Sequence, residues 1–133
     1  MQPITQTPAA STAAKTVLVV DDFASVRFYH ANLLRQAGYR SLDARDGFEA
    51  FDKLRQQPTD LILLDMIMPK MSGEEFIRRI RSTPEFAKIP LLVITSEDIE
   101  EKIRGISGTG PLGFAIKPVT PGTLLEAVRK LLA

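Results

Sequence analysis

Four short apolar runs, each followed at once by polar residues, constrain the fold of this chain more than any other feature. They are Val17–Val20, Leu61–Leu64, Leu91–Ile94 and Phe114–Ile116, and segments with helical periodicity separate them. Apolar runs of this length between helical patterns are typical of parallel strands that are buried on both faces. The chain is therefore predicted to be an α/β protein built around a parallel sheet.

The segments between these runs predict one more strand and five helices. A short, weak strand is expected over Arg40–Ala44. The helices are expected over Ser25–Gln36, from Asp46-Gly47 to just before Pro58, after Ser72, after Ser96 and after Thr120. Ser72 and Glu75 have the spacing of a capping box, and Pro121 stands at the first helical position after Thr120. Five strands alternating with five helices predict a doubly wound α/β fold.

Apolar residues at helical spacing predict which face each helix buries. The expected faces are Val26, Tyr29, Leu33 and Leu34 in the first helix, Phe48, Phe51 and Leu54 in the second, and Ile99, Ile103 and Ile106 in the fourth. Gly38 is placed to end the first helix.

The composition predicts one globular domain with a polar leader. Residues 1–15 are small, polar and aperiodic, as in a disordered leader, and residues 16–133 form the expected domain. The 17 basic and 16 acidic side chains nearly balance, so nothing indicates a surface for nucleic acid. Neither a membrane span nor a signal peptide is recognisable, so a cytoplasmic location without membrane contact is expected.

The residues at the ends of the strands carry the chemistry. Asp21 and Asp22 follow the first strand, and Asp65, Thr95 and Lys117 follow the apolar runs of the third, fourth and fifth. The carboxyl ends of parallel strands meet at one edge of the sheet, so these side chains should converge there. Three crowded carboxylates repel one another unless a divalent cation lies among them. With no cysteine and one histidine, the chain offers oxygen ligands, which favours magnesium, calcium or manganese.

These residue types fit a site at which a carboxylate is phosphorylated. Asp65 is the expected nucleophile toward phosphorus. Asp22 is the first choice as a direct Mg²⁺ ligand, and Asp21 binds directly or through water, with a backbone carbonyl just past Asp65, waters and a phosphoryl oxygen completing the shell. Thr95 and Lys117 supply donors for the phosphoryl oxygens. Each residue alone is more often a helix cap or a solvent-facing side chain, and only their joint presence favours this site.

By these residues the chain resembles the receiver domains of two-component response regulators. The resemblance covers about residues 16–133. Its markers are Val19-Val20-Asp21-Asp22, Asp46-Gly47, Leu64-Asp65 with Met68-Pro69, Ser72-Gly73, Thr95-Ser96, Phe114 and Lys117-Pro118. The run Asp21–Arg27 is most similar to single-domain, chemotaxis-type regulators.

The resemblance implies a flavodoxin-like sheet with strand order 2-1-3-4-5 and a phosphorylated Asp65. The donor would be a phosphohistidine on a histidine kinase or a phosphotransfer protein, and Mg²⁺ would bind Asp21, Asp22, Asp65 and the backbone carbonyl of Ile67. Thr95 and Phe114 would carry the switch, Lys117 would contact the phosphoryl group, and the Lys117-Pro118 bond would be cis. An effector would bind the face formed by the fourth helix, fifth strand and fifth helix. The chain would catalyse only its own phosphorylation and dephosphorylation.

Three positions depart from the usual pattern of such domains. Ile67, two residues after the acceptor, stands where many relatives have a polar residue. Phe114 replaces the commoner Tyr and lacks its hydroxyl. The segment Gly105–Gly113, which covers the end of the partner-binding helix and the following loop, is richer in Gly than usual and includes a Pro.

Other functions fit the residues less well. A phosphatase with an Asp nucleophile needs a second Asp two residues later, where this chain has Ile67. An FMN-binding protein of the same fold class needs Ser, Thr and Gly donors after the first strand, whereas Asp21 and Asp22 repel a phosphate. A phosphorylation-independent interaction module would not need an intact site. A role as phosphorelay intermediate or phosphate sink, without an effector of its own, stays open.

Overall fold

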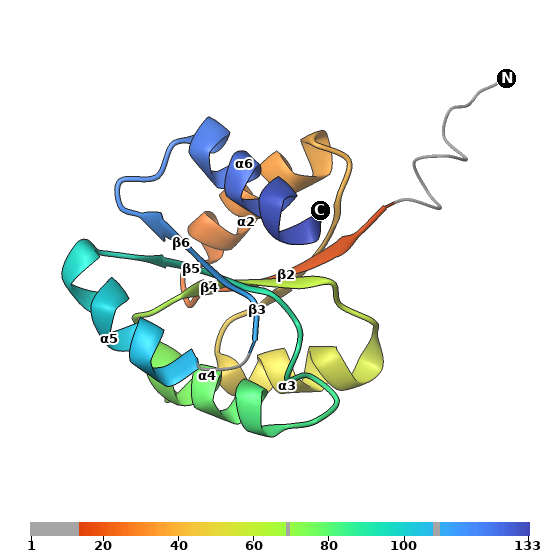
Figure 1. Cartoon of the computed structure of the whole chain (residues 1–133). Coiled ribbons are helices and arrows are strands. Elements are labelled where there is room, and N and C mark those ends of the chain that lie inside the picture. Colours follow the sequence, from red (N-terminus) through yellow and green to blue (C-terminus); the bar gives the residue numbers. More distant parts are fainter. Residues whose placement is uncertain (1–13, 69, 108–109) are drawn as a thin grey trace, which may run out of the picture.

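The computed structural model describes residues 14–68, 70–107 and 110–133, without the side chains of residues 97–98 and 106–107. Within them the chain forms a parallel sheet of five strands in the order β3-β2-β4-β5-β6 (Figure 1). The strands are β2 (Thr16–Val20), β3 (Arg40–Ala44), β4 (Leu61–Asp65), β5 (Leu91–Thr95) and β6 (Leu112–Ile116). Because β2 is the first strand along the chain, this order corresponds to 2-1-3-4-5 when the strands are counted from one. The predicted fold class is therefore confirmed. The expected leader lies outside the described residues except for its last two positions.

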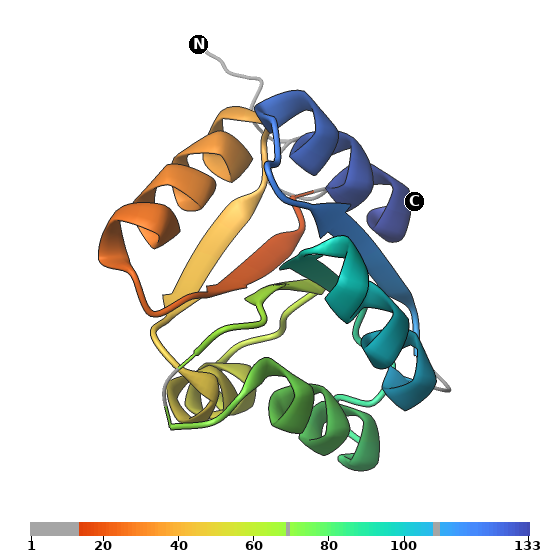
Figure 2. The same ribbon diagram turned by 90° about the vertical axis from the view of Figure 1, so that its left-hand side faces the viewer.

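Helices cover both faces of the sheet. They are α2 (Ala24–Gln36), α3 (Gly47–Gln56), α4 (Gly73–Ser82), α5 (Glu97–Ser107) and α6 (Pro121–Leu132). Helices α2 and α6 lie on one face of the sheet, and α3, α4 and α5 lie on the other. The sheet separates the two helical layers in both views (Figures 1 and 2). Among the described residues no helix is long and apolar enough to cross a membrane.

The continuous apolar runs are explained by burial on both faces. In β4, Leu61 and Leu63 pack into the core under α2 and α6, while Ile62 and Leu64 pack into the core under the other three helices. All four side chains are buried. Strand β3 is at an edge of the sheet and its residues are less buried, in keeping with its weak sequence pattern.

Side-chain caps set the start of three helices where the sequence predicted them. Asp46 accepts a hydrogen bond from the Glu49 amide at 2.8 Å, and Thr120 accepts one from the Thr123 amide at 3.2 Å. Ser72 likewise caps α4. Gly38 follows α2 with a φ of 98°, the left-handed conformation that glycine adopts without strain.

Two predicted buried faces are partly wrong. Tyr29 in α2 is 49% exposed and Phe48 in α3 is 51% exposed. In α2, Leu34 is buried as predicted, and His30 and Ala31 are buried beside it in place of Tyr29. Both exposed rings lie at the margin of the buried stripe, where helical spacing alone does not separate the core from the surface. The side chain of Ile106, predicted to be buried in α5, lies outside the described part of the chain.

Candidate functional site

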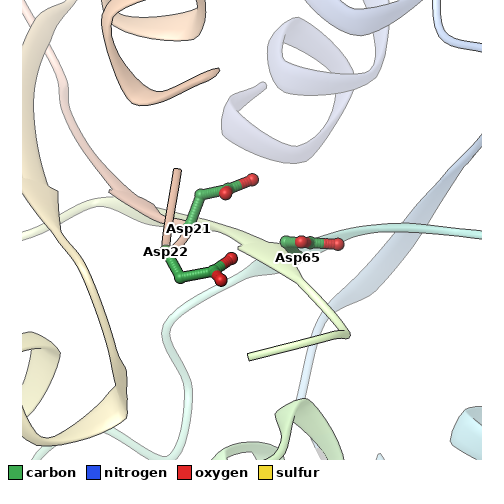
Figure 3. A group of neighbouring side chains, drawn as sticks. All are labelled: Asp21, Asp22 and Asp65. Carbon is green, nitrogen blue, oxygen red and sulfur yellow. The ribbon is translucent and has the colours of Figure 1, made fainter. Parts of the chain in front are cut away.

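Three carboxylates meet at the carboxyl edge of the sheet. Asp21 and Asp22 follow β2, and Asp65 is the last residue of the neighbouring strand β4. Figure 3 shows the three side chains gathered at this edge, and each offers an oxygen within 4.8 Å of the others. We call these three residues the acidic cluster. It brings together residues that are 43 and 44 positions apart in the sequence, as the parallel topology requires.

The environment of the acidic cluster suits a bound cation. Burial raises the pKa of Asp21, the Phe23 amide that donates to its Oδ1 at 2.9 Å opposes that rise, and the charges of Asp65 and Asp22 add to it. The Oδ1 atom of Asp22 is buried and has no hydrogen-bond partner among the described residues. A buried carboxylate oxygen without a partner is costly. A divalent cation would satisfy that oxygen and offset the repulsion.

Lys117 supplies a positive charge to the carboxylate of Asp65. Its Nζ lies 3.3 Å from Oδ1 of Asp65, and its backbone amide donates to the carbonyl of Thr95 at 2.9 Å. The Lys117 side chain is half exposed. The Lys117-Pro118 bond is cis, as the resemblance implied. The turn after β6 thus directs the ammonium group toward the end of β4.

Thr95 lies in the same cavity lining as Asp65. It ends β5, is buried, and its Oγ1 has no hydrogen-bond partner within the part of the chain that the structure describes. The cavity has a volume of about 120 Å³, and its lining also includes Ile67, Ser96 and Lys117. A phosphoryl group on Asp65 would give this hydroxyl an acceptor.

Phe114 lies outside the lining of this cavity. It is half-buried in β6 and packs against the core beneath α3, α4 and α5. The guanidinium carbon of Arg104 in α5 lies 4.7 Å from the centroid of its ring. Phe114 is also among the residues that line an open groove of about 550 Å³ between β6 and α6. The ring therefore contacts α5, and its residue borders the groove beside α6.

Ile67 is 71% exposed and lies at the rim of the cavity. An apolar side chain thus borders the access to Asp65, where a polar residue would bind water. The role of its backbone carbonyl as a metal ligand stays a prediction.

Arg27 also contacts the site, although its sequence position did not predict this. Its Nη1 donates to the backbone carbonyl of Asp21 at 2.8 Å, and its Nε pairs with Asp43 of β3 at the same distance. An arginine in the first turns of a helix has no feature in the sequence that would indicate this contact.

Comparison with known proteins identifies the class to which this fold and site belong. Residues 17–129 match the response regulator receiver domain, and the chain belongs to this family. Chemotaxis protein CheY-3 of Vibrio cholerae serotype O1 is 35% identical over 116 residues, which cover 86% of this chain and 89% of that protein.

Two solved structures support the same assignment. Chemotaxis protein CheY4 of Vibrio cholerae is 34% identical with a TM-score of 0.81, and the match covers 90% of this chain and 100% of that one. A response regulator receiver protein from Pseudomonas putida is 34% identical with a TM-score of 0.78, covering 89% and 98%. The predicted resemblance to chemotaxis-type receiver domains is confirmed.

Proposed function

We propose that this chain is a phosphorylation-activated signalling protein that accepts a phosphoryl group on Asp65 from a phosphohistidine of a histidine kinase or phosphotransfer protein. The observation that carries the proposal is the convergence on Asp65 of two further carboxylates, an ammonium group at 3.3 Å and a hydroxyl that has no hydrogen-bond partner among the described residues. A structural carboxylate would need none of these groups. Together they match the needs of a transferring phosphoryl group, whose oxygens carry spread negative charge.

The transfer itself is a nucleophilic substitution at phosphorus. A carboxylate oxygen of Asp65 forms the new P–O bond while the P–N bond to the donor imidazole breaks, and the electron pair and then a proton go to the imidazole nitrogen. Lys117 is placed to neutralise one phosphoryl oxygen, and Thr95 to donate a hydrogen bond to another.

Asp21, Asp22, Asp65 and the backbone carbonyl of Ile67 would hold Mg²⁺ in this proposal. When bound, the ion supplies positive charge that lets an anionic donor approach a cluster of acids. The buried Oδ1 of Asp22 supports this assignment, because no described group competes for it.

Thr95 and Phe114 would transmit the phosphorylated state. The Thr95 hydroxyl would move toward a phosphoryl group on Asp65 and make room into which the ring of Phe114 can turn. The half-buried position of the ring and its contact with Arg104 of α5 support this role. A signal would then leave through the face formed by α5, β6 and α6.

Exposed apolar side chains suggest where partners bind. The large apolar side chains that are exposed among the described residues are Phe23, Phe28, Tyr29, Phe48 and Ile67. Three of these side chains lie just after a strand or at the start of a helix on the carboxyl edge of the sheet, namely Phe23, Phe48 and Ile67. A phosphodonor would therefore meet an apolar rim around Asp65. The groove between β6 and α6, which Phe114, Ala127 and Leu131 help to line, suits an effector.

Radioactive labelling tests the proposal directly. Incubation with acetyl phosphate or a phosphorylated kinase should label the wild type and an Asp52→Asn control, which alters an exposed aspartate of α3, but not Asp65→Asn. Labelling should also require Mg²⁺. Equal labelling of Asp65→Asn, or full labelling in EDTA, would contradict the proposal.

The output is tested by pull-down with and without beryllofluoride, a mimic of the phosphoryl group. A partner gained with the mimic supports an effector. A histidine phosphotransfer protein as the only partner would instead support the role of relay or sink. The absence of nucleic-acid and membrane binding and the cytoplasmic location stay predictions.

A further inference from the structure

The turn between β2 and α2 carries two of the three carboxylates, and one arginine fixes its backbone. Arg27 folds back from α2, donates from Nη1 to the backbone carbonyl of Asp21 at 2.8 Å and pairs through Nε with Asp43 of β3 at 2.8 Å. Its side chain is only 17% exposed. A guanidinium held by two acceptors in this way spans β3, the turn and the helix.

The remaining supports of the turn show why this contact matters. The amide of Asp21 donates to the carbonyl of Ala44 at 3.1 Å, and the amide of Phe23 donates to Oδ1 of Asp21. Phe23 occupies the N-cap of α2 and has no side-chain group that could cap the helix. Arg27 therefore helps to hold this turn, since the N-cap residue Phe23 makes no side-chain hydrogen bond to it.

The direction of the Asp22 side chain depends on this turn. Its Oδ1 is buried without a hydrogen-bond partner among the described residues, so no such bond fixes that oxygen. The peptide unit between Asp21 and Asp22 contains the carbonyl that Arg27 binds. Rotation of that peptide would carry the carboxylate of Asp22 away from the acidic cluster.

We propose that Arg27 is a positioning residue for the divalent cation of the acidic cluster. It acts by orienting the peptide between Asp21 and Asp22, and Asp43 keeps its guanidinium in place. This inference rests on the proposed function, since it concerns the Mg²⁺ that the transfer to Asp65 needs.

A purely electrostatic role for Arg27 predicts the opposite sign. A positive charge near a cation site repels the cation, so its removal alone would tighten Mg²⁺ binding. Loss of positioning would weaken binding instead. The direction of the change in affinity therefore distinguishes the two roles.

The experiment is a titration of the unphosphorylated protein with Mg²⁺, followed by amide chemical shifts. Arg27→Met should weaken Mg²⁺ binding about 10- to 100-fold. This is the range found for groups that orient metal ligands without contacting the metal themselves. Arg35→Met is the matched control, because it removes the same charge from an exposed position of the same helix, and it should leave the affinity near that of the wild type. Arg27→Lys and Asp43→Asn should give smaller losses, since each retains a positive charge that can reach the Asp21 carbonyl.

The outcomes separate this inference from the proposed function. Wild-type or tighter Mg²⁺ affinity in Arg27→Met overturns it, even if thermal unfolding shows a loss of stability. If Arg27→Met does not fold, the inference is overturned when Arg27→Lys and Asp43→Asn both bind Mg²⁺ as the wild type does. If the wild type binds no Mg²⁺, both the proposed metal site and the role of Arg27 are overturned. If every Arg27 and Asp43 variant binds Mg²⁺ as the wild type does, only the role of Arg27 is overturned.

Discussion

The two sides of the site are held in place in different ways. On the side of β2 and β4, Asp21 is fixed by the Phe23 amide and by Arg27. On the side of β5 and β6, the Thr95 hydroxyl has no partner among the described residues, and Phe114 is half-buried beneath an exposed arginine. We call these the metal side and the switch side, after the roles proposed for them. The metal side is built to keep one arrangement, whereas the switch side contains groups that can change partners, which a two-state element needs.

The switch side is nevertheless anchored at its far end. Arg81 of α4 donates to three backbone carbonyls, those of Ala87, Ile89 and Pro111, at 2.6 to 2.9 Å. Pro111 directly precedes β6. A guanidinium of α4 therefore holds the backbone at the start of β6.

The largest expected effect comes from breaking the metal side. Asp22→Asn should lower Mg²⁺ affinity at least about 100-fold, the upper limit for groups that only orient ligands, because a direct ligand is lost. Thr95→Val, on the switch side, should leave that affinity unchanged but abolish the response of Phe114 to beryllofluoride. Titration with Mg²⁺ and aromatic NMR measure the two. Equal loss of Mg²⁺ binding in both variants would contradict the division of the site.

Arg81, which anchors the switch side, should make a large contribution to the free energy of unfolding of the protein. Arg81→Met should lower the free energy of unfolding by about 2–3 kcal/mol, because charge-assisted hydrogen bonds to three carbonyls are lost. A Cβ at position 110 would overlap Cζ of Arg81, so Gly110→Ala should displace the guanidinium and cause a similar loss. Denaturant unfolding checks both, with Arg78→Met as the control.

Arg78 makes an exposed pair with Glu74 one turn along the same helix. Such pairs contribute about 0–1 kcal/mol, so Arg78→Met should change little. A loss in Arg81→Met no greater than in this control would show that the three carbonyl contacts do not anchor β6.

Acidification should destabilise the protein through His30, the buried histidine of α2. Burial lowers the pKa of His30 below its usual 6.5, and the charge of Asp65 opposes this. As the pH falls from 6.5 toward the lower pKa of the folded state, the unfolded chain takes up a proton that folded His30 does not. The free energy of unfolding therefore decreases by up to about 1.4 kcal/mol for each unit of pH decrease. Urea unfolding at decreasing pH should show this slope in the wild type and a reduced slope in His30→Leu.

Asp21 should contribute a pH dependence of the opposite sign in the absence of Mg²⁺. Its folded pKa is raised above 3.8, so its charge costs stability at neutral pH, and the cost disappears as pH falls through the folded pKa. Asp21→Asn should remove this contribution. An Asp21→Asn variant no more stable than the wild type in EDTA at neutral pH would contradict it.

The fold and the meeting of the acidic cluster followed from the sequence because both depend on topology. Apolar runs located the strands, and parallel strands place their carboxyl ends together whatever the loops do, so Asp21 and Asp65 had to approach each other. Tyr29 and Phe48 were misplaced because helical spacing defines the edge of a buried face poorly. Arg27 and Arg81 were missed because long side chains reach carbonyls that only the folded backbone brings near, as with Arg81 and Pro111.

Ile67→Asn should shorten the lifetime of the phosphorylated protein severalfold. The side chain borders the access of water to Asp65 and is largely exposed, and an apolar group there cannot orient the attacking water, whereas an amide can. The decay of labelled protein after removal of the donor measures the lifetime. An unchanged or longer lifetime would mean that Ile67 has no part in the path of the water.

The smallest expected effect concerns the contact that holds Phe114. A cation over an aromatic ring at an exposed site contributes about 0.5–1 kcal/mol, so Arg104→Met should change the ratio of the two ring positions about two- to fivefold before phosphorylation. Glu100 pairs with the Arg104 Nε at 2.8 Å and keeps the guanidinium over the ring, so Glu100→Gln should shift the ratio in the same direction by less. Ring NMR of Phe114 with and without beryllofluoride measures the ratio, and Arg79→Met, which removes the more distant contact over Phe48, is the control. If the ring signals of Phe114 are the same in Arg104→Met and the wild type, in both states, the arginine does not restrain the ring, and the mobility of the switch side must come from Thr95 alone.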